Sequence, residues 1–128
     1  MQRVMDIALW IGQGLLALAF VVAAYVHAVR WEKTSAVPQM LWLRDLGHRR
    51  SLGIGALEAA GGIGVIAPAV TGIQPWLVPV AATGLVLLML SAIVFHAMRR
   101  EYPNIVLNAI LGAVALFVAY GRFVLVPF

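Results

Sequence analysis

The chain has 128 residues, of which 63% are hydrophobic and 11% are charged. A soluble domain has about 45–50% apolar and about 25% charged residues, so this composition excludes an ordinary soluble domain and indicates a protein solvated by lipid. The net charge of +4 does not indicate nucleic-acid binding, because no segment could form a soluble basic face. The absence of cysteine excludes thiolate metal sites and disulfide chemistry on this chain.

Four hydrophobic segments are long enough to cross a hydrocarbon core of about 30 Å, which takes about 20 helical residues. They cover residues 7–29, 52–70, 77–98 and 104–120. Together they use most of the chain, and a chain of this length has room for one domain. We therefore predict a single all-α domain, residues 1–128, folded as a bundle of four transmembrane helices.

The first loop contains a short segment with its own helix signals. Pro38 begins this segment and Gly47 ends it, as in many short helices. Its mixed polarity predicts an interfacial helix that lies on the membrane surface, where Trp42 is expected as an anchor beside Trp31 and Tyr102. Ser51 is predicted to cap the second transmembrane helix.

The distribution of Lys and Arg predicts the orientation in the membrane. The loops 30–51 and 99–103 contain seven of them, whereas the other side has only Arg3 and Arg122. Because cytoplasmic loops carry the excess of basic residues, both loops should be cytoplasmic and both termini outside, in a bacterial cytoplasmic (inner) membrane. Four arginines are interpreted as topogenic charges, with binding of anionic lipid as the alternative: Arg49, Arg50, Arg99 and Arg100.

Each predicted span contributes one polar residue to the same half of the membrane: His27, Glu58, His96 and Asn108. Tyr102 is expected to close this layer at the membrane surface. An ionised carboxylate at such a depth costs about 2.5 kcal/mol or more unless it is paired, so Glu58 needs a partner or a proton. A histidine at a similar depth is the nearest candidate partner.

This polar cluster has several interpretations. Hydrogen bonds among His, Asn and Glu hold membrane helices together, so the cluster can be purely structural. It can also form a pocket for a small molecule or a lipid head group, with a quinone as the leading ligand. A haem held by His27 and His96 is a weaker alternative, because two histidines without further motif say little. Passage of protons or ions is the last one. No catalytic residue and no other metal site is predicted.

The order and spacing of several short motifs are similar to those of the DoxX-like family of small four-helix membrane proteins, over nearly the whole length. The motifs lie at residues 20–27, 55–62, 67–76, 95–103, 108 and 120–123. In one place the chain departs from the family pattern. The first helix of such proteins often ends with a Gly and, three residues later, a Lys, where this chain has Ala24 and His27. A histidine there would carry a charge that depends on pH.

The resemblance implies a function only in outline. The family is named for a subunit associated with a quinol oxidase, and relatives are linked to thiosulfate–quinone and oxidative-stress complexes. We therefore expect an accessory or structural subunit of a larger membrane complex, respiratory or redox-linked, with other subunits or further copies of itself as partners. The alternatives are a quinone- or haem-binding redox subunit that uses the polar cluster, and a protein that binds or transports lipids or small molecules. Intrinsic enzymatic activity is not expected, except as a quinone-linked oxidoreductase subunit.

Overall fold

The computed structural model describes residues 1–128, and it is all-helical with no strand. The long helices are α1 (Gln2–Ala24), α4 (His48–Gly64), α6 (Leu77–Met98) and α7 (Tyr102–Tyr120). Helical turns extend three of them, so the four candidate membrane spans are Gln2–Val29, His48–Thr71, Leu77–Met98 and Tyr102–Leu125. The predicted four-helix transmembrane fold is confirmed, and the chain is an integral membrane protein.

Two of these extensions are π-helical turns, at Tyr25–Val29 after α1 and at Gly121–Leu125 after α7. Turns of this type are rare and occur frequently at functional sites. The first contains His27 and the second contains Arg122. Both turns therefore place a polar side chain at the end of a span.

The loop between the first two spans contains α2 (Trp31–Thr34), a 3-10 turn (Pro38–Met40) and α3 (Leu41–Leu46). The predicted short helix is therefore present, and Gly47 ends it with a φ of 91°. The prediction that Ser51 caps the next helix is wrong. Because Gly47 turns the chain sharply, α4 begins at His48, and the Ser51 hydroxyl donates back to the Gly47 carbonyl at 2.8 Å.

The second span is broken near its far end. The helix α4 ends at Gly64, and the chain continues as the short helix α5 (Ala67–Thr71), which has Pro68 in its first turn. Proline lacks the amide hydrogen that a continuous helix needs, so a break before it follows from the sequence. Gly72 then adopts a left-handed conformation with φ of 71° and ends α5.

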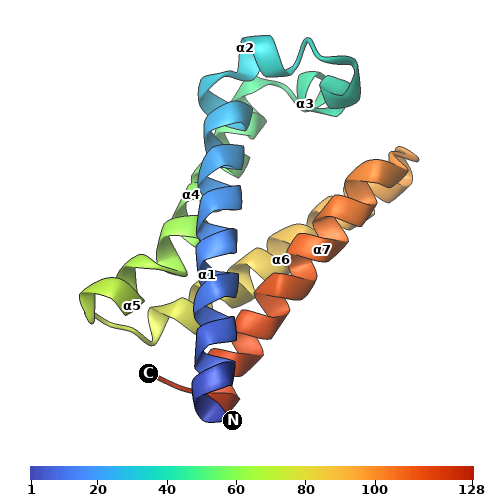
Figure 1. Cartoon of the computed structure of the whole chain (residues 1–128). Helices are drawn as coiled ribbons and strands as arrows, with labels where there is room; N and C mark the ends of the chain where they lie inside the picture. The colour runs from blue at the N-terminus through green and yellow to red at the C-terminus, as the bar shows by residue number, and fades with distance from the viewer.

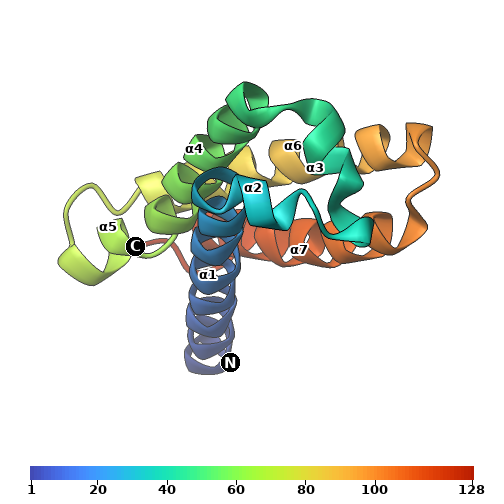
Figure 2. The same cartoon turned by 90° about the horizontal axis from the view of Figure 1, so that it is seen from above.

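The four long helices form two antiparallel pairs, α1 with α4 and α6 with α7. The pairs meet at the end of the molecule where both termini lie, and they diverge toward the end that carries α2 and α3 (Figure 1). Seen from above, α3 lies over the space between the pairs (Figure 2). The apolar core fills the region where the pairs meet: Leu16, Phe20, Val65, Val78, Ala82, Leu85, Met89, Ala115, Val118 and Ala119.

Close packing of α1 against α4 depends on glycine. A Cβ atom at Gly55 would lie 2.7 Å from the Cβ of Ala28 and 3.2 Å from the carbonyl oxygen of Ala24. Small residues allow such approaches between membrane helices, where little hydrophobic force acts between them. Only 25 of the 128 residues are buried, so the large apolar side chains on the outer faces of the helices contact lipid.

Candidate functional site: a polar cavity between the helix pairs

The first element of the site is a hydrogen-bonded pair between α1's π-helical turn and α4. The Nδ1 atom of His27 lies 2.8 Å from Oε1 of Glu58. The side chain of Glu58 is 5% exposed and that of His27 is 15% exposed. The sequence predicts that Glu58 has a partner or a proton, with a histidine as the nearest candidate partner, and His27 lies at hydrogen-bond distance from it. With Nδ1 donating, a neutral His27 keeps Nε2 as an acceptor.

The second histidine belongs to a chain of ion pairs at the tip of α6. His96 Nδ1 lies 3.0 Å from Oε1 of Glu101, which also accepts from Arg99 Nε at 2.9 Å. Arg99 Nη2 donates to Asp45 Oδ2 at 2.7 Å. This hydrogen bond to Asp45, followed by the one to Glu101, raises the pKa of Arg99 above its ordinary value. The network ties α3 to the end of α6.

Trp42 connects the two histidines. Its ring makes edge-on contacts with His27, with ring centroids 5.4 Å apart, and with His96, at 4.9 Å. The side chain is buried, and its Nε1–H has no hydrogen-bond partner. An unpaired buried donor costs about 1–3 kcal/mol, so natural structures rarely keep one without a reason.

One cavity of about 330 Å³ lies between the helix pairs, beneath α3, and Trp42, Glu58 and the two histidines line it. Ligand sites commonly have volumes of about 300–1,000 Å³ with apolar walls and a few polar groups. All four polar residues of the predicted cluster reach the cavity. The complete lining is His27, Met40, Trp42, Leu46, Ile54, Glu58, Leu88, Met89, Ser91, Ala92, Phe95, His96, Asn104, Leu107 and Asn108.

The other residues singled out in the sequence lie elsewhere. Tyr102 is 63% exposed and does not line the cavity, whereas Asn104, one half-turn further along α7, does. Arg49, Arg50 and Arg100 are exposed and form no ion pair. Arg99 is the exception among the four arginines, because it holds Asp45 and Glu101.

Sequence reasoning missed the role of Trp42, which it treated as an interfacial anchor. The signal that could have found it is the mixed character of the short helix around it. An indole that faced the head groups would be exposed, whereas this one is 8% exposed. The indole therefore packs against the two histidines rather than at the membrane surface.

A second polar cluster, at the end where the termini lie, was also missed. Arg122 is buried and donates from Nε to Gln13 Oε1 at 2.8 Å and from Nη1 to Asp6 Oδ1 at 2.7 Å. Its guanidinium lies over the ring of Phe128, 4.1 Å from the centroid. Gln13 in turn donates to the Val65 carbonyl at 2.8 Å. These hydrogen bonds tie α1 to the C-terminal segment.

Comparison with known proteins settles the family. The family model described as the DoxX-like family matches residues 11–118. The chain belongs to the DoxX-like family. The matched region of this DoxX-like protein contains every residue that lines the cavity. No curated protein and no solved structure matches the chain.

The cavity of this DoxX-like protein combines donors and acceptors. Trp42 offers an N–H, and the two histidines offer Nε2 as acceptors once Nδ1 donates to a carboxylate. The side-chain amides of Asn104 and Asn108 can donate and accept, and neither forms a hydrogen bond within the chain. Such a set suits a small ring with oxygen atoms. It suits a haem less well, because the indole of Trp42 contacts both imidazoles that would have to bind the iron.

Proposed function

We propose that this DoxX-like protein binds a quinone-type ring in the cavity between its two helix pairs. The observation that carries the proposal is a cavity of about 330 Å³ with polar groups in an apolar wall, which includes the indole of Trp42, whose buried N–H has no hydrogen-bond partner. A carbonyl oxygen of a quinone would accept this hydrogen bond and remove the cost of burying the donor unpaired. The apolar remainder of the wall, with Leu88, Met89 and Phe95, suits the faces of the ring.

The polar residues of the cavity would have different roles in binding the ring. Trp42, Asn104 and Asn108 would donate to ring oxygens and orient the ring. His27 and His96 each lie within hydrogen-bond distance of a carboxylate through Nδ1, so each would have Nε2 free to accept a hydrogen bond or a proton. A quinone supplies exchange of two electrons and two protons, and these two pairs are groups that could hold those protons.

The proposal includes a place for the protein in the cell. We propose a bacterial inner membrane, with the loops of residues 30–51 and 99–103 cytoplasmic and both termini outside. The excess of basic residues in these loops supports this orientation. The burial of Arg122 against Asp6 strengthens the argument, because it leaves Arg3 as the one unpaired basic side chain at the opposite end.

The accessory role in a larger membrane complex stays a prediction. A subunit that binds a lipid-soluble carrier is compatible with it, because such a carrier is used together with a redox partner. A purely structural subunit, however, needs no cavity with polar groups in its wall. Binding of a ring is therefore the reading that the geometry favours.

The test is equilibrium binding of the tail-less ubiquinone ring to the protein in lipid nanodiscs, measured by calorimetry. Trp42→Phe keeps the aromatic contacts and removes the N–H, so we expect affinity to fall about tenfold, equivalent to about 1.4 kcal/mol for one hydrogen bond. Any loss of thermal stability should come from the smaller ring alone, because the lost donor is unpaired in the free protein.

Trp31→Phe is the matched control. The Nε1–H of Trp31 is already used, since it donates to the Leu43 carbonyl at 3.2 Å, and its ring stacks on His48 outside the cavity. This variant should lose some thermal stability and keep its affinity for the ring. Absence of binding to the unmodified protein, or equal affinity in Trp42→Phe, would contradict the proposal.

A further inference from the structure

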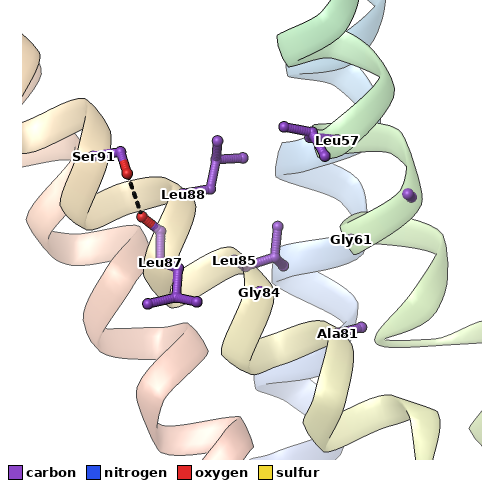
Figure 3. A pocket seen from close by; sticks show the side chains of 9 residues that line it. Leu57, Gly61, Ala81, Gly84, Leu85, Leu87, Leu88 and Ser91 are labelled. Carbon is purple, nitrogen blue, oxygen red and sulfur yellow. Dashed lines mark hydrogen bonds between the residues drawn. The ribbon is translucent and has the colours of Figure 1, made fainter.

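A second hollow lies on the lipid-facing side of the molecule, between α4 and α6. It is a groove of about 430 Å³, with Leu57 and Gly61 on one wall and the residues from Ala81 to Ser91 of α6 on the other (Figure 3). Leu57 and Leu87 are 60% and 61% exposed. The groove is therefore open toward the hydrocarbon of the bilayer.

The groove has no free polar group in its wall. Ser91 is the one residue there with a polar side chain, and its hydroxyl donates to the Leu87 carbonyl at 2.9 Å (Figure 3). The other lining residues are leucine, alanine and glycine. Because each donor in its wall is satisfied, the groove suits a hydrocarbon chain rather than a polar molecule.

The groove adjoins the polar cavity. Leu88 and Ser91 line both of them, so these two residues mark the junction. On α4, Leu57 in the groove directly precedes Glu58 in the cavity. The polar cavity beneath α3 and the apolar groove that opens to lipid therefore lie side by side.

We propose that the groove between α4 and α6 holds the hydrocarbon tail of the molecule whose ring occupies the cavity, and that this ligand enters sideways from the bilayer. The inference rests on the proposed function and adds the class of ligand, a ring with a long apolar tail. Ser91 and Gly84 are about 10 Å apart along α6 at about 1.5 Å per residue, a length that a decyl chain covers.

Gly84→Leu tests the path of the tail. A Cβ at Gly84 meets nothing within 4 Å, and Gly84 lines the groove, so a larger side chain there would take up space in it. The two probes are decylubiquinone and the tail-less ubiquinone ring, in the same nanodiscs. We expect the variant to bind decylubiquinone about tenfold more weakly, because its side chain occupies the space of the tail. The affinity for the tail-less ring should change less than about twofold.

Gly53→Leu is the control, because a Cβ at Gly53 also meets nothing within 4 Å and Gly53 does not line the groove. It should leave both affinities unchanged. If Gly84→Leu lowers the affinity for both probes equally, or for neither, the inference about the tail is overturned. Ring binding by the unmodified protein, and with it the proposed function, would still stand. If the unmodified protein binds neither probe, the proposed function itself fails, which is a distinct result.

Discussion

Glu58 illustrates how a single side chain constrains the fold of a membrane protein. Its carboxyl group is almost completely buried, in a span where an unpaired charge costs about 2.5 kcal/mol or more. His27 meets it from the neighbouring helix at 2.8 Å. Each residue would be unfavourable alone, and the pair therefore fixes the register of α1 against α4 at this depth.

We expect Glu58→Gln to be tolerated better than Glu58→Ala. Glutamine keeps an oxygen that can accept from His27, whereas alanine leaves the imidazole unpaired, at a cost of about 1–3 kcal/mol. Thermal unfolding in detergent, followed by tryptophan fluorescence, measures the difference. Glu32→Ala is the control, because Glu32 is exposed and forms no ion pair. Equal and negligible losses in both Glu58 variants would refute the pairing.

Arg122→Lys should release the C-terminal segment. A lysine has a single donor group and cannot bond Gln13 and Asp6 simultaneously from a planar fork, so we expect a loss of about 1–3 kcal/mol in stability. Faster trimming of residues 121–128 by a carboxypeptidase would report the release directly. Arg3→Lys, at an exposed and unpaired position, should show neither effect. An unchanged trimming rate in Arg122→Lys would show that the segment is held by other contacts.

At the scale of whole helices, glycine decides how closely the elements pack. Gly55 allows α4 to approach the backbone of α1 near Ala24. The sequence shows that α4 is rich in glycine, but it does not show which glycines face a neighbour. Gly53 and Gly55 differ by two positions along the chain and so lie on different sides of the helix.

Gly55→Ala should therefore destabilise the protein, whereas Gly53→Ala should not. Both substitutions bring the same gain in helix propensity, so their difference isolates the clash with Ala24 and Ala28, which we put at about 1–3 kcal/mol. Unfolding midpoints of the two variants, measured side by side, give this difference. Equal midpoints would mean that the helices move apart without cost.

The spans could be predicted from the sequence because each depends on its own run of apolar residues. The predicted bounds 77–98 agree with α6 at both ends. The beginning of α4 could not be predicted in the same way, because the positive φ of Gly47 removes the need for a cap at Ser51.

Some residues of the site could likewise be predicted from the sequence, and others could not. The depths of His27, Glu58, His96 and Asn108 could be counted along each helix, which is why the cluster was predicted. Trp42 and Arg122 could not be placed so, because their burial depends on how α3 and the C-terminal segment fold back onto the spans. An aromatic residue or an arginine near the end of a span looks the same in the sequence whether it faces water or a neighbouring helix.

At the scale of the molecule, the two ends of the bundle differ in their number of basic residues. Both termini lie at the end where the helix pairs meet, and α2 and α3 lie at the other (Figure 1). The excess of basic residues at the α3 end predicts that this end is cytoplasmic.

Single cysteines test this orientation cleanly, because the chain has none of its own. Ile73 and Gln39 are both exposed and lie at opposite ends of the molecule. In intact cells, an impermeant thiol reagent should label Ile73→Cys and spare Gln39→Cys until the membrane is opened. Labelling of Gln39→Cys alone would reverse the orientation.

Because the helix pairs meet at one end only, a small rotation of a pair at that end moves its other end much further. The helix α6 has 22 residues and is about 33 Å long at about 1.5 Å per residue. A rotation of this helix by about 5° about its first residue, Leu77, therefore moves its last residue, Met98, by about 3 Å. That movement exceeds what a hydrogen bond tolerates. The ion pair of Asp45 with Arg99, at 2.7 Å, should therefore break when the packing changes at the opposite end of the molecule.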